Sequence, residues 1–353
     1  MKNQINLTNN YFKFTIVVIG YKEWRMRMVN IKDVAKFANV STATVSRIIN
    51  DRPGANVETE KRVREAIKKL NYHPNNIARS LSNKSSNLIA FIVPNLNNPY
   101  FTDLINLLDV SAEKHGYKLY LCNSNDNSKN ISYFLKSIVD NYIKTVIINS
   151  LAVTDEHIDY LKKHNITVIT IDRTNLVNYP NAVSIDHYRG SYLATKYLIK
   201  NCKCNNIIFI SGSMKEQSSI SRFNGYKEAV EKYTKHQSIR LLEGDFTFVS
   251  GYKLAKEELQ KTTQIHGIVC ANDAMAIGVI RACFELNIKI PEDVQIIGYD
   301  NCSLSSYTTP ALTTVNQLDF KLGEIIMDAI DKGEDIKSEL IPEIIMRETT
   351  KER

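Results

Sequence analysis

The run STATVSRIIN, from Ser41 to Asn50, combines residue types that are suited to reading DNA. Its apolar members recur at helical spacing and would face a core: Val45, Ile48 and Ile49. The others would face outward: Thr42, Ala43, Ser46, Arg47 and Asn50. Short polar side chains let a helix enter the major groove, and an arginine can form a bidentate contact with guanine. The run therefore predicts the recognition helix of a helix-turn-helix, with an ordinary amphipathic helix pair as the alternative.

Two further helices would hold this run in place. A first helix is predicted by apolar residues at helical spacing, namely Ile31, Val34, Ala35 and Ala38. Asn39 and Val40 would form the turn, and the Ser41 side chain would cap the second helix by accepting hydrogen bonds from its free amides. A third helix is expected from Glu58 to Leu70, with an apolar stripe made of Val63, Ala66, Ile67 and Leu70.

From Asn87 onward, short apolar β-rich runs alternate with helical segments. The expected strands are Leu88–Val93, Lys118–Asn123, Thr145–Ser150, Thr167–Asp172, Asn206–Ser211, Gly267–Asn272 and Val294–Asp300. Such alternation predicts doubly wound parallel sheets, and these strands are too many for one sheet. We therefore expect an α/β core of two Rossmann-like subdomains whose carboxyl strand ends enclose a ligand-binding cleft. No glycine-rich dinucleotide motif, phosphate loop or catalytic triad motif occurs, so an enzyme is not expected.

The order of helix-turn-helix, third helix, Pro74 and the segment Ile77–Leu81 resembles the headpiece and hinge of the LacI family of bacterial repressors. The resemblance runs from about Met28 to the C-terminus and is closest to the ribose and purine repressor branch. In that family the hinge becomes a helix on operator DNA, and a leucine, here Leu81, wedges into the minor groove and kinks the duplex. Without the resemblance, this segment would be interpreted as a polar linker. The implied DNA-contacting residues are Asn30, Ser41, Thr42, Ala43, Thr44, Ser46, Arg47, Asn50, Asn56, Thr59, Asn76, Ala78 and Leu81.

The core resembles the periplasmic ribose-binding proteins, which have the same fold as the core of the LacI family. Motifs such as NNPYF, TIDR, CANDAMA and IGYD match their sugar-contacting positions. The implied effector-binding residues are Asn98, Tyr100, Phe101, Asp172, Arg173, Arg222, Phe246, Asn272, Asp300 and Gln317. Carboxylates and amides pair with sugar hydroxyls, arginines add forked donors, and aromatic rings pack on the apolar face of a sugar. Basic clusters that would bind phosphate are absent from this set, which disfavours a nucleotide or a sugar phosphate.

These residues also have structural alternatives. An Asp or Asn at a strand end is often a helix cap rather than a ligand contact. Tyr100 and Phe101 could be packing residues of a cleft wall, and Arg222 a surface charge. Because all ten fall together on the ligand positions of the family, ligand binding is favoured.

The positive charge of the chain is concentrated near its start. Residues 28–86 carry 11 Lys and Arg against 5 Asp and Glu, a net of +6 in a formal total of +7. Residues 1–27 carry 5 basic residues against 1 acidic residue, which leaves a net of −3 for residues 87–353. A basic headpiece on a slightly acidic core is typical of a module that contacts phosphate, attached to one that does not.

The cysteines indicate a reducing compartment. They show no metal-binding spacing and are expected to be reduced, mostly buried thiols of a cytoplasmic protein: Cys122, Cys202, Cys204, Cys270, Cys283 and Cys302. Neither a metal nor a cofactor is expected.

The expected domain limits follow the same motifs. Residues 28–73 would form the headpiece and 74–86 the hinge, and 87–353 would form the core. Its N-subdomain would comprise about 87–185 and 318–340, and its C-subdomain about 186–316 and 341–353. The apolar run FTIVVIG in residues 1–27 is too short to span a bilayer and lacks a cleavage site. Because the codons of Lys22 and Glu23 can form a ribosome-binding sequence ahead of Met26, we expect a native start at Met26 or Met28 and a non-native or disordered extension before it.

Together these features predict a homodimeric repressor of a sugar-utilisation operon that binds a pseudo-palindromic operator in double-stranded DNA. A free monosaccharide, with ribose as the expected sugar, would close the cleft, move the hinges relative to each other and release the DNA. The first alternative is a catabolite-control-type regulator that a phosphorylated phosphocarrier protein activates. The second is a sugar-binding transport protein with the same core, against which the headpiece and the lack of an export signal argue.

Overall fold

The computed structural model describes residues 29–51, 53–73, 80–81, 84–172, 181–234, 237–262, 264–318 and 321–352. They fall into two compact units, divided between residues 79 and 80. The expected N-terminal extension, most of the expected hinge and the candidate residues Asn76, Ala78 and Arg173 lie outside the described residues.

The first unit contains three helices, α1 (Ile31–Ala38), α2 (Thr42–Ile49) and α3 (Val57–Lys69). Asn39 ends α1 with a left-handed backbone at φ 50°, which starts the turn, and the Ser41 Oγ caps α2 by accepting from the Thr44 amide at 3.1 Å. The three helices share one apolar core, made of Val34, Ala35, Ala38, Val45, Ile48, Val63, Ala66 and Tyr72. The predicted helix-turn-helix and third helix are confirmed, although α3 begins and ends one residue earlier than predicted.

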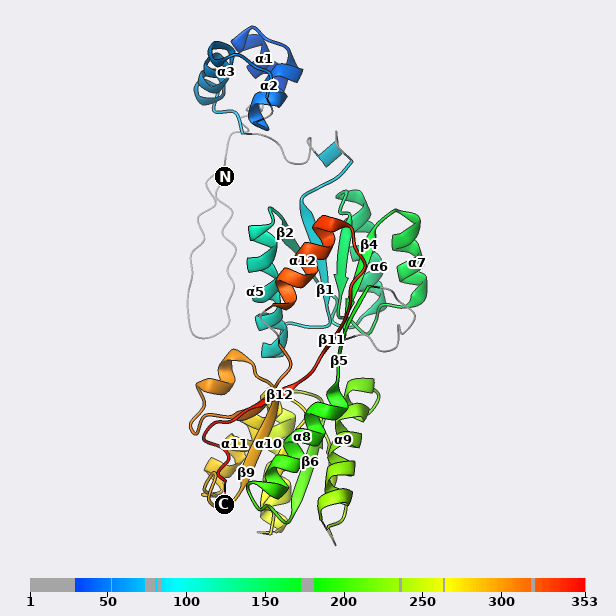
Figure 1. Ribbon diagram of the computed structural model, residues 1–353, viewed down its shortest axis with the longest axis vertical. Coiled ribbons are helices and arrows are strands. Elements are labelled where there is room, and N and C mark those ends of the chain that lie inside the picture. Colours follow the sequence, from blue (N-terminus) through cyan, green and yellow to red (C-terminus); the bar gives the residue numbers. More distant parts are fainter. Residues whose placement is uncertain are drawn as a thin grey trace, which may run out of the picture. The chain divides into compact units, whose positions relative to one another are not determined.

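The second unit contains two six-stranded sheets. The first sheet has the order β11-β5-β4-β3-β1-β2 and is parallel throughout. Its strands are β1 (Leu88–Val93), β2 (Lys118–Asn123), β3 (Thr145–Ile148), β4 (Thr167–Ile171), β5 (Ala182–Ile185) and β11 (Lys337–Leu340). Helices pack on both of its faces, as Figure 1 shows. On one face α5 (Pro99–Lys114) and α12 (Leu322–Lys332) contribute to one apolar cluster. On the other face α6 (Ser128–Asp140) and α7 (Asp155–Lys163) contribute to a second apolar cluster.

The second sheet has the order β12-β10-β9-β8-β6-β7, and only its β10–β12 pair is antiparallel. Its strands are β6 (Ile207–Ser211), β7 (Leu241–Glu243), β8 (Gly267–Cys270), β9 (Gln295–Asp300), β10 (Thr313–Asn316) and β12 (Glu343–Ile345). Helix α8 (His187–Lys200) packs along α9 (Gln217–Tyr233), and α10 (Phe248–Lys261) along α11 (Asp273–Glu285). A short 3-10 helix, η2 (Ser303–Ser306), follows β9.

The chain crosses between the two sheets at three places in the second unit: between β5 and α8, between β10 and α12, and between β11 and β12. Each predicted strand is present. Strands β3, β4 and β8 end earlier than predicted, so Asn149, Asp172 and Asn272 lie after the strands in which they were expected. Five strands were not predicted: β5, β7, β10, β11 and β12.

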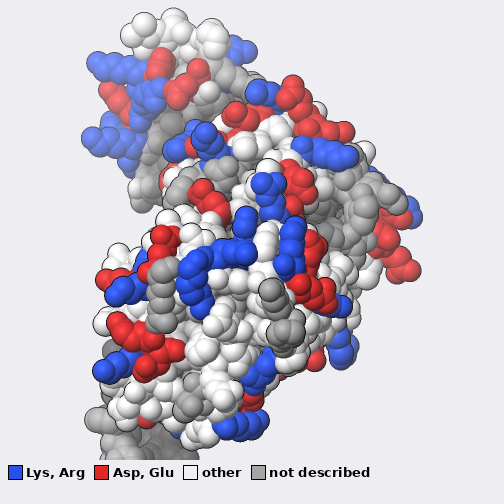
Figure 2. All heavy atoms as spheres, turned by 60° about the horizontal axis from the view of Figure 1, so that its bottom comes forward, with Lys and Arg blue, Asp and Glu red and all other residues white. Residues whose placement is uncertain are grey.

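No described helix is long and apolar enough to cross a membrane. On the face of the molecule drawn in Figure 2, basic and acidic side chains are interspersed over most of the surface. All six cysteines are buried and form no disulfide among the described residues.

Candidate functional site

Helix α2 has the predicted buried and exposed faces. Val45 and Ile48 are buried, and Ile49 is half-buried. The outward residues Thr42, Ala43, Arg47 and Asn50 are exposed, and Thr44 and Ser46 are half-buried. The Arg47 side chain lies against Gly54, whose backbone has a positive φ of 114° and where an added Cβ would come within 3.4 Å of Arg47 Nη1. A basic group is therefore exposed on the polar face of a helix-turn-helix.

Three other residues of the predicted DNA-contacting set cap helices. Asn30 Oδ1 accepts from the Lys32 amide at 2.8 Å, and Asn56 Oδ1 accepts from the Thr59 amide at 2.8 Å. Ser41 caps α2 in the same way. These contacts give each residue a structural role at a helix N-terminus, the end of a helix that also attracts phosphate. Leu81, in the second unit, is 56% exposed.

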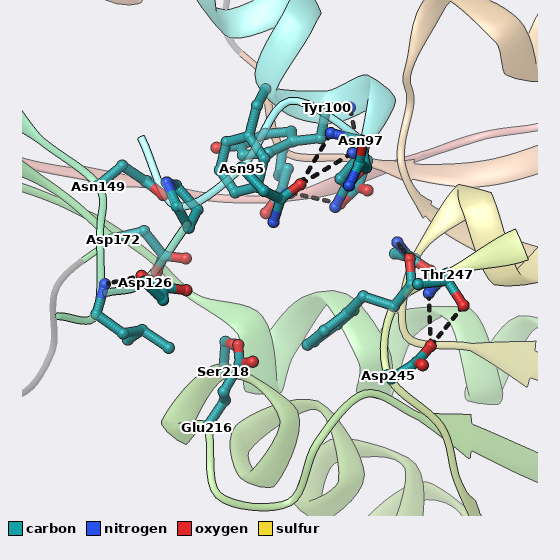
Figure 3. A pocket seen from close by; sticks show the side chains of 18 of the residues that line it. Asn95, Asn97, Tyr100, Asp126, Asn149, Asp172, Glu216, Ser218, Asp245 and Thr247 are labelled. Carbon is teal, nitrogen blue, oxygen red and sulfur yellow. Dashed lines mark hydrogen bonds between the residues drawn. The ribbon is translucent and has the colours of Figure 1, made fainter. Parts of the chain in front are cut away.

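The second unit contains a cleft of about 390 Å³ between the carboxyl ends of the two sheets. All nine predicted effector-binding residues that the structure describes line it: Asn98, Tyr100, Phe101, Asp172, Arg222, Phe246, Asn272, Asp300 and Gln317. The close-up in Figure 3 shows the side chains labelled there around a common space, with Asp126 and Asp172 on one side and Asp245 and Thr247 on the opposite side.

Strand ends and helix starts position these side chains. Asn98 follows β1 and caps α5, where its Oδ1 accepts from the Tyr100 amide at 3.1 Å. Asn272 follows β8 and caps α11, and its Nδ2 also donates to the Phe246 carbonyl at 2.9 Å. Asp172 follows β4, and Gln317 follows β10. The helix-cap alternative is therefore correct for the two asparagines, and both still line the cleft.

Asp300, the last residue of β9, is the most deeply buried acid of the cleft lining. It is 2% exposed, and its Oδ1 accepts from Gln317 Nε2 at 2.5 Å. Its Oδ2 is buried and has no hydrogen-bond partner among the described residues. Burial raises the pKa of Asp300 well above its usual range, and the Arg222 charge opposes that shift. A buried acceptor without a partner costs free energy, and a donor supplied by a ligand would offset that cost.

Arg222 is not a surface charge, because only 4% of the residue is exposed. Its Nη1 donates to the Ala271 carbonyl at 2.7 Å, and its Nη2 donates to Gln317 Oε1 at 3.3 Å. The guanidinium also lies 4.1 Å from the centre of the Tyr299 ring, in cation–π contact. This packing fixes a forked donor in the wall of the cleft.

The backbone has a positive φ at five of the described lining residues, Asn125, Asp126, Asp172, Phe246 and Asp300. Asp172, Phe246 and Asp300 have positive φ values of 54°, 64° and 120°, which non-glycine residues rarely adopt. Such conformations cost about 1–3 kcal/mol each and cluster at functional sites. Gly212 makes room for Phe246, since a Cβ there would lie 2.1 Å from the Phe246 ring.

Acidic residues outnumber basic ones in the described lining of the cleft. Five lining residues are carboxylic acids, and Arg222 is the one Lys or Arg among the described residues that line it. The acids are Asp126, Asp172, Glu216, Asp245 and Asp300. Burial raises the pKa of Glu216. An anionic ligand would meet repulsion from these groups, whereas a neutral ligand with many hydroxyls would find acceptors.

Sequence reasoning did not select several residues that belong to this region. Asn149 follows β3 and lines the cleft with its Nδ2 donating to the Ile171 carbonyl at 2.9 Å, so the strand-end pattern would have included it. Asp126, Glu216 and Ser218 line the cleft from loops and a helix start, where the sequence gives no comparable signal. His187 lies behind the lining and contacts both Asp172 and Arg222.

Models of known protein families match both units of the chain. A family model described as "Bacterial regulatory proteins, lacI family" matches residues 30–75. A model for "Periplasmic binding proteins and sugar binding domain of LacI family" matches residues 86–351, most of the chain. The chain belongs to the LacI family. The predicted family and the predicted fold class, a helix-turn-helix headpiece with a two-subdomain α/β core, are thereby confirmed.

Relatives within the LacI family differ in their named roles. The chain is 33% identical over 334 residues to the HTH-type transcriptional repressor PurR of Pasteurella multocida, covering 92% of this chain and 100% of the relative. It is 32% identical over 330 residues to the ribose operon repressor of Halalkalibacterium halodurans, covering 92% and 98%. It is 32% identical over 306 residues to catabolite control protein A of Priestia megaterium, covering 86% and 92%.

Two solved structures of the family are similar to this chain. One is a lac repressor dimer bound to operator and an anti-inducer, with a TM-score of 0.79 and 25% identity over 92% of this chain and 99% of that one. The other is a LacI family regulator from Enterococcus faecium with bound ribose, with a TM-score of 0.66 and 28% identity over 74% and 98%. The chain is thus a DNA-binding transcriptional regulator with a ligand-binding core, and the relatives named PurR and ribose operon repressor are transcriptional repressors.

Proposed function

We propose that this chain is a homodimeric, cytoplasmic repressor of a sugar-utilisation operon and that a free monosaccharide, ribose, releases it from its operator. The observation that carries the proposal is the carboxyl group of Asp300. It is buried in the wall of the cleft, and its Oδ2 has no partner among the described residues. A sugar hydroxyl is a donor of the right kind for that atom.

The rest of the lining suits the same ligand. Tyr100 and Phe101 form an edge-to-face pair with ring centres 5.2 Å apart, and Phe246 adds a third ring. Such rings provide an apolar surface for the C–H face of a sugar. The carboxyl and amide groups between them accept and donate to vicinal hydroxyls.

The charge of the cleft supports a free sugar over a phosphorylated one. Arg222 is already engaged with Ala271 and Gln317, and five acids line the same cleft. A phosphate is bound most strongly by cationic side chains, and Arg222 is the one Lys or Arg among the described lining residues. The ribose operon repressor among the relatives and the ribose-bound regulator among the solved structures support ribose as the sugar.

The mechanism would rest on closure of the cleft. Asp172 reaches the ligand from the first sheet, whereas Arg222 and Asp300 reach it from the second. A ligand held by both walls favours a closed arrangement of the subdomains. In a dimer like the operator-bound lac repressor, such a change would alter the spacing of the two DNA-binding units, and operator affinity would fall.

A second candidate is regulation by a phosphorylated phosphocarrier protein. The similarity to catabolite control protein A favours it, because that identity is as high as the identity to the ribose operon repressor. It leaves the unpartnered Oδ2 of Asp300 without a role, and we therefore rank it second.

Thermal unfolding and DNA binding of the full chain test the proposal. We expect ribose to raise the unfolding temperature, since a ligand at 100 times its Kd adds about 2.7 kcal/mol to stability. The same concentration should release the operator in an electrophoretic shift assay. The panel includes other monosaccharides, purine bases and the phosphorylated phosphocarrier. Stabilisation by a purine base alone would refute the sugar assignment, and tighter operator binding with the phosphocarrier but no response to any sugar would establish the second candidate.

A further inference from the structure

His187 occupies a special place in the chain. It is the first residue of α8, directly after the crossing from the first sheet to the second. It is 3% exposed and does not line the cleft. A buried polar ring at a crossing point must have its hydrogen bonds satisfied by residues of the two subdomains themselves.

The two ring nitrogens contact opposite walls of the cleft. His187 Nε2 lies 2.7 Å from Asp172 Oδ1, at the end of β4 in the first subdomain. His187 Nδ1 lies 3.3 Å from Arg222 Nε and 3.2 Å from Arg222 Nη2, on α9 of the second. The Tyr299 hydroxyl, on β9, lies 3.3 Å from the same Nδ1.

These contacts determine where the proton of the ring lies. A guanidinium has donors only, so Nδ1 must accept, and the proton must be on Nε2, from which it is donated to Asp172. Burial lowers the pKa of His187 and the Arg222 charge lowers it further, while Asp172, and to a lesser extent Asp186 at the N-cap of α8, oppose the shift. A second proton would place an N–H on Nδ1, directly against the donors of Arg222.

The other side of Arg222 is held at a second crossing. Gln317 follows β10, where the chain returns toward the first sheet. Its Oε1 accepts from Arg222 at 3.3 Å, and its Nε2 donates to Asp300 at 2.5 Å. Residues at two of the three crossings therefore contact the same guanidinium. A continuous series of polar contacts, through His187, Arg222 and Gln317, joins Asp172 to Asp300.

We propose that His187 is a positioning residue of the effector site: as a neutral ring it holds Asp172 of one wall and Arg222 of the other in the geometry that binds the ligand, and so makes ligand binding depend on how the subdomains are arranged. The inference rests on the proposed function of the cleft. It assigns a role to a residue that cannot touch the ligand.

Two conservative substitutions separate the two contacts. His187→Gln keeps an amide near the position of Nε2 and loses the acceptor for Arg222. His187→Asn keeps an acceptor near the position of Nδ1 and loses the donor to Asp172. His187→Leu removes both, and His164→Leu is the matched control, because His164 is exposed and its ring contacts only the Tyr160 carbonyl among the hydrogen bonds described.

Ribose affinity, measured by calorimetry on full-length protein, is the first readout. Hydrogen bonds to charged groups are strong, so His187→Leu should raise the Kd about tenfold or more, with smaller increases for the Gln and Asn variants. The His164→Leu control should match the wild type. Unchanged affinity in all three His187 variants would overturn the inference.

The pH dependence of that affinity is the second readout, which a merely structural role would not move. The wild type should bind ribose more weakly once the pH falls below about 6.5, the ordinary histidine pKa, because the pKa of His187 is lowered from that value. Other groups of the cleft titrate as well, so the comparison with His187→Asn isolates the histidine. An identical pH profile in that variant would count against the inference.

The third readout needs no ligand and therefore distinguishes the two proposals. Long-range nitrogen–proton NMR of histidine-labelled protein, with His187 assigned from the spectrum of His187→Asn, reports which nitrogen carries the proton. A neutral ring protonated on Nε2 at pH near 7 supports the inference, and protonation on Nδ1 or on both nitrogens overturns it. If the wild type binds no monosaccharide, the proposed function is wrong, and the NMR result alone decides whether His187 holds Asp172 and Arg222.

Discussion

Substitution of Asp300 by asparagine tests the central claim about the cleft. The side chain keeps its size, and its carbonyl oxygen can still accept from Gln317 Nε2, which lies 2.5 Å from Asp300 Oδ1. What disappears is the second acceptor, Oδ2, which has no partner among the described residues. The substitution therefore removes a ligand contact and leaves the packing in place.

The expected loss of affinity follows from the type of bond. A hydrogen bond to a charged acceptor contributes about 1.5–3 kcal/mol, which corresponds to a Kd for ribose that is about 10 to 150 times higher. Because the headpiece is a separate unit, Asp300→Asn should bind the operator like the wild type. It should fail to release the operator at ribose concentrations that release the wild type.

The free protein should become more stable. Because burial penalises the charged form of Asp300, its replacement by a neutral amide should gain about 1 kcal/mol, or about 2–4 °C in unfolding temperature. Because the pKa of Asp300 is raised in the folded state, the folded protein binds more protons than the unfolded chain above the ordinary aspartate pKa. Asp300 therefore lowers stability as the pH rises through that range, and the gain in Asp300→Asn should be larger at pH 8 than at pH 5.

Asp245 provides the matched control. It lines the same cleft, but its Oδ1 accepts from the Thr247 amide at 3.0 Å and from the Thr247 hydroxyl at 2.6 Å. Burial alone would raise the pKa of Asp245, but hydrogen bonds from Thr247 and Ser250 lower it below its ordinary value. Asp245→Asn should lose stability at neutral pH where Asp300→Asn gains it. Calorimetry and gel shifts that show normal ribose release by Asp300→Asn, or a loss of its stability, would refute the reasoning.

Three further substitutions test the predicted DNA contacts and the cleft wall. Arg47→Ala should weaken operator binding by about 1–3 kcal/mol and relax the preference at one base pair, whereas an equal loss on random DNA in the same titration would mean that Arg47 contacts phosphate only. Leu81→Ala should reduce affinity for the operator and leave weak binding to random duplexes nearly intact, and parallel losses on both would contradict a wedge in the minor groove. Gly212→Ala should weaken ribose binding in calorimetry, because its Cβ would lie 2.1 Å from the Phe246 ring and displace it; an unchanged Kd would show that the ring does not contact the sugar.

Burial explains which strands could be predicted from the sequence. The central strands β1, β3, β6 and β8 are covered on both faces, so each contains a run of consecutive apolar residues. The edge strand β7 is only half-buried, and β11, which reads KSEL, alternates between exposed and half-buried side chains. Such strands lack the apolar run that identifies a buried strand.

Strand β10 was missed for a different reason. It is central and buried, but it begins with two threonines whose hydroxyls serve buried polar contacts. The Thr314 hydroxyl donates to Asp273 Oδ1 at 2.5 Å, and Thr313 pairs with the Thr350 hydroxyl at 2.8 Å. The hydrogen-bond partners of these two threonines lie far away in sequence. From the local sequence alone, a buried strand with polar residues of this kind resembles a loop.

The candidate site divides in the same way. Residues at strand ends could be selected, since the carboxyl ends of parallel strands meet at one edge of each sheet. His187 could not, because its importance lies in two contacts, to Asp172 and to Arg222, that exist only after both sheets have formed. No local pattern in the sequence reports a contact of that kind.

The backbone strain and the unpartnered acceptor in the cleft bear on how a ligand would change the arrangement of the two subdomains. Asp172, Phe246 and Asp300 hold unfavourable backbone conformations, and Asp300 carries an acceptor without a partner among the described residues. A ligand that satisfies that acceptor gains more in the arrangement where Asp172 and Arg222 reach it together than in one where they are apart. Only such a difference between two arrangements can shift their populations. Since His187 and Gln317 tie those side chains to the crossings between the sheets, a small neutral sugar could reorient the subdomains, and with them the DNA-binding units of a dimer, without contacting either unit.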